Sequence, residues 1–270
     1  MEGTDYKTIA KNVGPLKRLG QNFLINSRIA KTEANFGIDR NVVELGPGLG
    51  ILTKELCKIA KHVTAVEKDK RLCEVLSEIR SRKLELINDD FFNVNSKLTA
   101  DIMISNIPYN LSSKVLSWLG SVQMPAVLCL QREFVEHMTA KPGSRSYSRL
   151  SVFSYLQFKM SYIMDVPAND FYPMPRVGSA LVYLKPKQTG ITKGSYEVLA
   201  LLMMHKKKTL KNALMDSAKL LGIEKDQLSS IAQTMPNRDK RPLHLSPEDL
   251  LSASDYISKE LKKIRSISQN

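Results

Sequence analysis

Short apolar runs alternate with amphipathic stretches along the first two-thirds of the chain. Compact runs rich in Val, Ile and Leu predict buried strands, and apolar residues three or four positions apart predict helices. Strands are predicted at 42–45, 63–67, 84–87, 101–105 and 125–131, with later ones around 151–166 and 179–185. Helices are predicted at 51–62, 70–81 and 112–119. The alternation predicts an α/β fold with a doubly wound, mainly parallel sheet and an antiparallel edge.

The pattern changes after the last predicted strand. The segment KPKQTGITKG at 185–194 gathers Pro, Gly and Lys and is typical of a linker. Residues 195–270 show mostly helical spacing. We therefore expect a larger domain over 1–187, whose polar and basic residues 1–18 form a mobile N-terminal arm, and a smaller helical domain over 188–270.

Composition narrows the class of protein. Of the 270 residues, 43% are hydrophobic and 25% charged, which excludes collagen-like, low-complexity and wholly disordered proteins. No apolar run approaches the roughly 20 residues of a membrane helix, and the first residues lack the apolar core of a signal peptide. The three cysteines contain no CxxC pair, so neither a disulfide framework nor a zinc site is expected. We expect a cytoplasmic protein without a metal and without membrane contact.

Basic residues exceed acidic ones by 40 to 27, which gives a net charge of +13. The excess is spread along the chain, with 26 basic and 18 acidic residues through Lys187 and 14 and 9 beyond it. Such an excess favours a polyanionic partner, because cationic side chains release the counterions condensed on nucleic acid. A basic protein without such a partner explains the composition equally well. The run Lys206 to Lys208 likewise fits an RNA contact or a solvated helix face.

A glycine-rich turn follows the first predicted strand. The sequence VVELGPGLG places Gly46, Gly48 and Gly50 between a strand and a helix, where glycine lets the backbone approach a ligand. Glu67 ends the second strand, where a carboxylate can bind ribose hydroxyls. The GxGxG spacing fits a nucleoside without a pyrophosphate better than a dinucleotide. A purely structural glycine turn is the alternative, and Glu67 makes the cofactor site the preferred interpretation.

Polar groups also follow the third and fourth strands. Asp90 could accept the exocyclic amine of an adenine, although a helix-cap aspartate is the simpler explanation without other evidence. Asn106, Ile107, Pro108 and Tyr109 have the shape [DN]-x-P-[YF]. The Asn106 side-chain oxygen and the Ile107 carbonyl can accept hydrogen bonds from an aromatic amine. Pro108 stiffens the turn, and Tyr109 offers a face on which an unstacked base can lie.

These motifs occur together with others in a fixed order. They are LGQNFL at 19–24, VELGPGLG at 43–50, NIPY at 106–109, QREFVEHMTAKPGSRSYSRLSV at 131–152 and VPANDFYPMPRVGSALV at 166–182. Over about residues 16–187 the chain resembles the ribosomal RNA adenine dimethyltransferase family, of the kasugamycin-resistance, small-subunit type. HKKKTLKNAL at 205–214 is similar to a family segment as well.

The resemblance implies a Rossmann-like class I methyltransferase fold with S-adenosylmethionine as methyl donor and no metal. It implies dimethylation of the amino groups of two adjacent adenines near the 3′ end of small-subunit rRNA, during ribosome biogenesis. The implied partners are small-subunit rRNA and the immature small ribosomal subunit, and we expect a monomer.

The resemblance also assigns roles to individual residues. On the donor side it implies contacts from Asn22, Leu24, Gly46, Glu67, Asp90 and Asn106, with Glu67 at the ribose and Asp90 at the adenine of the donor. On the target side it implies Asn106 at the reacting amine, Pro108 in its turn, and Tyr109 and Phe171 as the two walls of a base clamp. Ile107 replaces the Leu that is usual in the family.

Two other functions stay open from the sequence. One is a large-subunit rRNA adenine methyltransferase of the antibiotic-resistance type, although KPGSRSYSRLSV and FYPMPRV are more similar to the small-subunit type. The other is an RNA-binding assembly factor that depends little on catalysis. Intact Gly46, Glu67, Asp90 and Asn106 favour catalysis but leave an added assembly role open.

Overall fold

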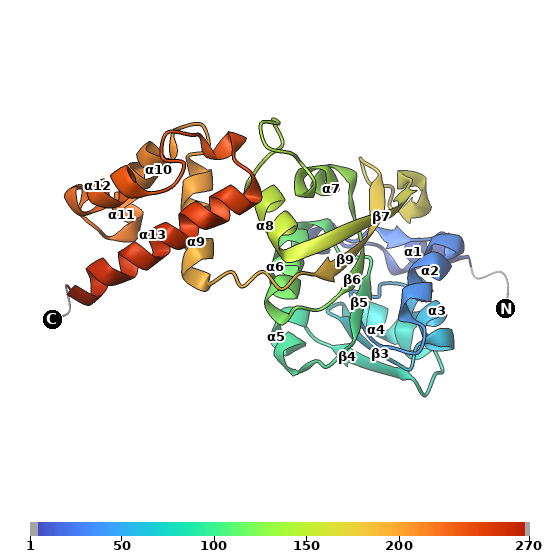
Figure 1. Ribbon diagram of the computed structural model, residues 1–270. Coiled ribbons are helices and arrows are strands. Elements are labelled where there is room, and N and C mark those ends of the chain that lie inside the picture. The colour runs from blue at the N-terminus through green and yellow to red at the C-terminus, as the bar shows by residue number, and fades with distance from the viewer. Residues whose placement is uncertain (1–4, 268–270) are drawn as a thin grey trace. The chain divides into compact units, whose positions relative to one another are not determined.

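The computed structural model describes residues 5–267 and divides the chain into two compact units (Figure 1). The first unit runs to Val135 and resumes over Phe158–Pro186. The second unit contains Glu136–Gln157 and the chain from Lys187 onward. The units differ from the two contiguous domains expected from the sequence, because residues 136–157 belong to the C-terminal unit, which resumes at Lys187.

The first unit is built on a seven-stranded sheet of order β4-β3-β2-β5-β6-β9-β7. Its strands are β2 (Asn41–Leu45), β3 (His62–Glu67), β4 (Leu84–Asn88), β5 (Ile102–Ser105), β6 (Ala126–Gln131), β7 (Phe158–Val166) and β9 (Ser179–Pro186). The strands from β4 to β6 pair in parallel, and β9 pairs antiparallel with both β6 and β7. The predicted doubly wound sheet with an antiparallel edge is confirmed.

The parallel strands are connected by helices α3 (Ile51–Ile59), α4 (Lys70–Ser77), the single turn α5 (Phe91–Val94) and α6 (Ser112–Val122). Helix α2 (Ser27–Ala34) precedes β2, and α7 (Arg132–Met138) follows β6. In α3, Leu52 and Leu56 are four positions apart and fully buried in a cluster with Val63 and Ile104 of the sheet. These i, i+4 contacts explain why the sequence period predicted the helices correctly.

The expected N-terminal arm is instead a helix, α1 (Tyr6–Val13), while residues 1–4 lie outside the described part. The Asp5 side chain caps it by accepting hydrogen bonds from the backbone of Lys7 and Thr8, both at 3.1 Å. Ala10 is fully buried in a cluster with Leu49 and Leu72. Polar composition suggested mobility, but Tyr6, Ile9 and Val13 pack on the same cluster, so α1 has an apolar face that docks on the first unit.

A two-stranded ribbon joins distant motifs beside the main sheet. Its strands are β1 (Phe23–Leu24) and β8 (Phe171–Tyr172), which pair antiparallel with Leu24 opposite Phe171. The ribbon brings LGQNFL next to FYPMPRV, although about 150 residues separate them in the sequence.

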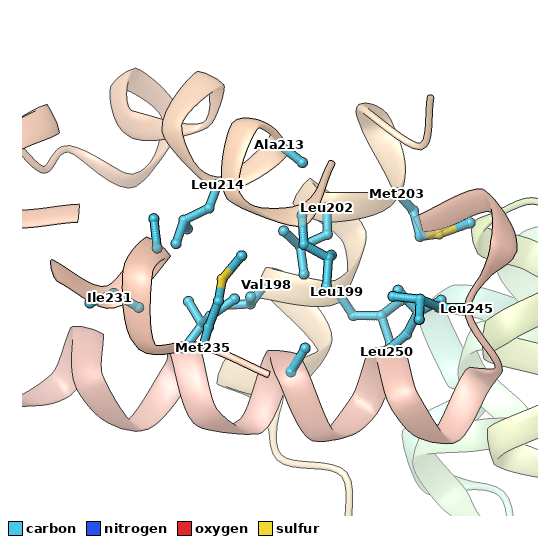
Figure 2. Packing of buried hydrophobic residues seen from close by; sticks show 14 of the residues in the cluster. Val198, Leu199, Leu202, Met203, Ala213, Leu214, Ile231, Met235, Leu245 and Leu250 are labelled. Atoms are coloured by element: carbon cyan, nitrogen blue, oxygen red, sulfur yellow. The ribbon is translucent and has the colours of Figure 1, made fainter. Parts of the chain in front are cut away.

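The second unit is helical. It contains α8 (Arg149–Gln157), α9 (Lys193–Met204), α10 (Leu210–Asp216), α11 (Ala218–Leu221), α12 (Lys225–Thr234) and α13 (Pro247–Ile267). Its core includes side chains from α9, α10, α12 and α13, as Figure 2 shows for Leu199, Leu214, Ile231 and Leu250.

Helix α8 corrects the strand expected from residue 151. Val152 and Leu156 lie four positions apart, and both are buried in the core of the second unit together with Tyr147. Tyr147 also donates a hydrogen bond from its hydroxyl to the Leu245 carbonyl at 2.9 Å. These contacts hold residues 136–157 in the C-terminal unit, so the next strand begins only at Phe158.

Among residues 5–267, no helix is both long and apolar enough to cross a bilayer.

Candidate functional site

The predicted site residues converge on one cavity of about 230 Å³ in the first unit. Residues that follow β2, β3, β4 and β5 line it, at the edge where parallel α/β sheets bind ligands. The lining residues that the sequence predicted are Asn22, Gly46, Glu67, Asp90, Asn106, Pro108, Tyr109 and Phe171.

The glycine turn forms one wall of this cavity. Gly46 donates its backbone N–H to the Val66 carbonyl at 2.8 Å, which fixes the turn against β3. Gly48 has φ of +59°, and a Cβ there would lie 3.0 Å from a ring carbon of Phe23. The backbone conformation and the nearby ring therefore both require glycine, and the turn leaves space for a ligand.

Glu67 ends β3 beside this turn. It is buried, and its carboxylate accepts backbone hydrogen bonds from Gly48 at 3.2 Å and Asp69 at 2.8 Å. Burial raises the pKa of the Glu67 carboxyl, while the two backbone donors oppose that shift. The carboxylate is thus held in one orientation at the cavity wall.

Asp90 is both a cavity residue and a helix cap, two positions that the sequence analysis treated as alternatives. Its carboxylate lines the cavity, and it also caps α5 by accepting the Phe92 N–H at 3.0 Å. It forms an ion pair with Lys68, whose Nζ lies 2.9 Å from Oδ2. The hydrogen bond from Lys68 is the main cause that lowers the pKa of Asp90, so this carboxylate is ionised at neutral pH.

The NIPY turn forms another part of the cavity wall, beside the glycine turn, where a Cβ on Gly46 would lie 3.7 Å from Pro108. Asn106 donates from Nδ2 to Oε2 of Glu33 at 2.9 Å, and within the described residues its buried Oδ1 has no hydrogen-bond partner. The Tyr109 hydroxyl is hydrogen-bonded to the Ser179 hydroxyl at 2.8 Å, which anchors the far end of the side chain. Phe171 lines the cavity from β8.

Leu24 differs from the other predicted residues. Its side chain packs in the apolar cluster that contains Ile29 and Phe171, and it does not line the cavity. Successive side chains of a strand point to opposite sides, and here the preceding Phe23 is the one that reaches the cavity. The structure therefore does not place Leu24 at the cavity.

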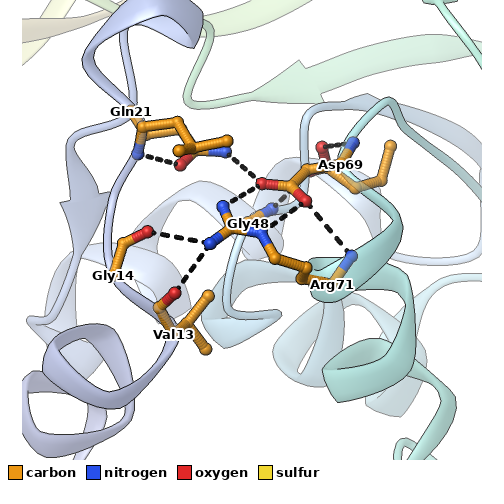
Figure 3. Close-up of polar contacts among 8 residues, drawn as sticks. Val13, Gly14, Gln21, Gly48, Asp69 and Arg71 are labelled. Atoms are coloured by element: carbon orange, nitrogen blue, oxygen red, sulfur yellow. Dashed lines mark hydrogen bonds and ion pairs between the residues drawn. The ribbon is translucent and has the colours of Figure 1, made fainter.

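A polar network that the sequence did not reveal joins the N-terminal segments to the loop after β3 (Figure 3). Arg71 binds both carboxylate oxygens of Asp69, at 3.0 and 2.6 Å, and donates to the Val13 and Gly14 carbonyls at 2.8 and 3.2 Å. Gln21 donates to Asp69 at 3.0 Å. The Arg71 hydrogen bonds are the main cause that lowers the pKa of Asp69 to about 2. The network connects α1 and the LGQNFL segment to the loop after β3.

The sequence analysis also missed Glu33 of α2. A signal was present, since Ile29, Ala30, Glu33 and Ala34 form one stripe at i, i+1, i+4 and i+5 of a helix. All four side chains are buried. A carboxylate inside an apolar stripe is unusual enough to mark a candidate site residue.

Comparisons with known proteins agree on one family. A family model described as ribosomal RNA adenine dimethylase matches residues 16–257. The chain is 38% identical over 259 residues to a probable ribosomal RNA small subunit methyltransferase A of Thermococcus kodakarensis, with 92% of each chain covered. It is 36% identical to a protein of the same description from Methanopyrus kandleri, covering 92% of this chain and 94% of that one.

Solved structures give the same result. A dimethyladenosine transferase from Plasmodium falciparum superposes with a TM-score of 0.73 at 26% identity, covering 87% of this chain and 97% of that one. The 23S rRNA methyltransferase ErmE superposes with a TM-score of 0.58 at 23% identity, covering 87% and 99%, and shares the fold. With a family model that spans most of its length and relatives at this identity, the chain belongs to the ribosomal RNA adenine dimethylase family.

Proposed function

We propose that this protein transfers methyl groups from S-adenosylmethionine to the amino groups of two adjacent adenines near the 3′ end of small-subunit rRNA. The observation that carries the proposal is the cavity that joins the glycine turn, Glu67 and Asp90 to the NIPY turn and Phe171. A donor nucleoside and a target base would share this one space. Family membership and the small-subunit relatives support this choice of substrate.

The residues on the donor side fit S-adenosylmethionine. The donor supplies a methyl group that is already activated on a sulfonium. Gly46 and Gly48 leave space that a Cβ would narrow, Glu67 offers acceptors for ribose hydroxyls, and Asp90 offers an acceptor for an adenine amine. Both carboxylates are held by hydrogen bonds, so little ordering is needed when the donor binds.

On the target side, catalysis consists mainly of positioning. Asn106 Oδ1 accepts a hydrogen bond from the adenine amine, and this draws the nitrogen lone pair away from the ring and toward the methyl group. Tyr109 and Phe171 hold the flipped base between their rings. The methylated nitrogen is cationic and releases its proton to water, so no buried base is required.

A basic surface of the second unit would contact the RNA. We define the C-terminal basic cluster as Lys206, Lys207, Lys208, Lys211, Arg238, Lys240 and Arg241. Backbone hydrogen bonds of 2.8 Å from Leu210 to Lys240 and 3.0 Å from Lys211 to Arg238 join its two segments. Cationic side chains gathered in this way suit phosphates of a folded RNA.

The test is methyl transfer to immature small subunits, read by mass spectrometry of rRNA nucleosides. We expect dimethyladenosine at two neighbouring positions with the wild-type protein. Asn106→Ala should retain donor binding while kcat falls about a hundredfold, as for loss of one catalytic hydrogen bond. Methylation of large-subunit RNA alone would replace the proposal with the antibiotic-resistance activity. Equal methylation by Asn106→Ala would show that the NIPY turn is only structural.

A further inference from the structure

Glu33 contacts the proposed reaction centre from outside the cavity. It lies on α2 and is fully buried, and its Oε2 accepts the hydrogen bond from Asn106 Nδ2 at 2.9 Å. Glu33 does not line the cavity, so it reaches a substrate only through Asn106. Its position is therefore that of a group that controls how Asn106 is presented.

The hydrogen bond with Glu33 determines which polar atom of the Asn106 amide remains without a partner. An amide has a donor end and an acceptor end, and the carboxyl oxygen of Glu33 engages the donor. The acceptor, Oδ1, is buried and has no partner among residues 5–267. Leaving a buried acceptor unpaired is costly, so such an atom beside a cavity indicates a donor that arrives with the ligand.

Helix α2 holds Glu33 firmly in this place. Ile29, Ala30 and Ala34 bury the same face of the helix in the apolar cluster of the sheet. At the N-terminus of α2, the Asn26 side chain accepts a hydrogen bond from the Arg28 N–H at 3.0 Å and donates one to the Asp170 side chain at 2.9 Å. Asp170 directly precedes Phe171, so one short helix links the Asn106 wall to the Phe171 wall.

We propose that Glu33 is a positioning residue that fixes the Asn106 amide with its oxygen toward the target amine, so that the site accepts a base carrying a hydrogen-bond donor. This inference rests on the proposed function. An amide without this partner is free to present its NH2 group to the cavity, and that group repels an amine donor and suits a carbonyl instead.

The charge state of Glu33 is compatible with this role. Burial is the main cause that raises the pKa of Glu33 to about 8, and nearby Glu44 raises it as well. Cys129, a cavity residue on β6, also faces this carboxyl. At neutral pH the carboxyl is protonated, and its carbonyl oxygen still accepts from Nδ2. Gln, which keeps a neutral acceptor of the same shape, is therefore the conservative replacement.

The experiment compares Glu33→Gln and Glu33→Met with a matched control, Glu44→Met. Glu44 is equally buried and accepts a hydrogen bond from the Thr53 hydroxyl at 2.8 Å, whereas the Asn106 side chain donates to Glu33. Each Met variant removes one buried carboxyl and leaves one donor unpaired. We expect kcat at saturating donor and RNA to fall about 10- to 100-fold in Glu33→Met, a typical cost of a misplaced catalytic group. It should stay within about threefold of wild type in Glu33→Gln and Glu44→Met, while the affinity for S-adenosylmethionine stays unchanged in Glu33→Met.

A double-mutant cycle separates positioning from a general effect on folding. If Glu33 acts through Asn106, adding Glu33→Met to Asn106→Ala should change kcat by less than about twofold. A full additional loss in that background would overturn the proposal, and so would wild-type kcat in Glu33→Met. Failure of the proposed function looks different, because then the wild-type protein itself produces no dimethyladenosine.

Discussion

Glu67 and Asp90 bring carboxyl groups to the donor side of the cavity, but their surroundings differ. Glu67 is buried and bound by two backbone donors, whereas Asp90 is partly exposed and paired with Lys68. We expect Glu67→Ala to weaken S-adenosylmethionine binding more than tenfold, since a hydrogen bond to a charged group contributes about 1.5–3 kcal/mol. Asp90→Ala should weaken it as well and should also lower the melting temperature, because α5 loses its cap.

Calorimetric titration of S-adenosylmethionine into both variants measures these effects. Glu74→Ala is a suitable control, because Glu74 is an exposed carboxyl of the same unit that does not line the cavity. Unchanged donor affinity in both the Glu67 and the Asp90 variants would show that the nucleoside of the donor does not bind in this part of the cavity.

The two proposed clamp residues can be separated from their hydrogen bonds. Tyr109→Phe keeps the ring and loses only the contact with Ser179, so we expect RNA binding close to wild type. Tyr109→Ala and Phe171→Ala should each lose roughly 1–3 kcal/mol of base stacking and raise KM for RNA. Steady-state kinetics on immature subunits provides the test. If Tyr109→Phe were as defective as Tyr109→Ala, the hydroxyl and not the ring would be the functional group.

At the scale of elements, the Arg71 network should determine whether α1 stays docked. Arg71→Met removes the ion pair with Asp69 and the hydrogen bonds to Val13 and Gly14 while keeping an apolar stem. We expect faster tryptic cleavage between α1 and β1, at Lys17 and Arg18, and faster release of S-adenosylmethionine. Arg80→Met is the control, because it also removes a guanidinium from the first unit. Equal cleavage rates in the two variants would mean that Ala10 and its apolar neighbours dock α1 alone.

Most elements of the sheet were predictable, because a strand buried on both faces leaves a continuous apolar run such as Ala126 to Leu130 of β6. Helix α8 was not, since its Val, Phe and Tyr residues favour strands and only the distant core of the second unit makes Val152 and Leu156 one face. Glu67, Asp90 and the NIPY turn followed from their positions at strand ends, whereas Asn22 and Phe171 were implied only by the family resemblance. Glu33 is marked only by its place in the apolar stripe of α2, and the contacts of Arg71 are made only in the fold.

At the scale of the whole molecule, two buried carboxyls should make stability depend on pH. Burial is the main cause that raises the pKa of both Glu33 and Glu44 to about 8, against 4.5 for the ordinary side chain. The folded protein therefore keeps protons that the unfolded chain releases, and their stabilising contribution is full below pH 4.5 and lost as pH rises through 8. The free energy of unfolding should fall by up to about 1.4 kcal/mol per pH unit for each group in this window.

Urea unfolding at a series of pH values checks this expectation. The double variant Glu33→Gln, Glu44→Gln should show a shallower fall between pH 5 and 8 than wild type, because neither amide titrates. Glu85→Gln, at an exposed carboxyl of β4, is the control and should keep the wild-type slope. An identical slope in the double variant would assign the pH dependence to other groups.

RNA binding should depend on salt through the C-terminal basic cluster. Lys206 donates to the Tyr147 carbonyl and Lys208 pairs with Asp216 at 2.5 Å, so both have structural partners. The exposed side chains of Lys207, Lys240 and Arg241 have no ion pair among residues 5–267, and we expect these to meet phosphates.

Replacing Lys207, Lys240 and Arg241 by Ala should flatten the salt dependence of RNA binding by up to about 0.9 in logarithmic slope per lost duplex contact. Binding to immature subunits across a salt series measures this slope. Replacing Lys219, Lys225 and Lys259, which lie in the same unit outside the cluster, is the control for net charge. An equal change in both triple variants would mean that the cluster has no special role.

The division of the chain at Val135, Gln157 and Pro186 has a consequence for how such proteins can exchange parts. The helical unit is not a contiguous tail, because Tyr147, Val152 and Leu156 complete its core from within the other unit's sequence. A chimera that takes only the residues after 187 from a relative would combine side chains of two parents in one core. Recombination between family members therefore preserves packing only when 136–157 and the C-terminal segment are inherited together.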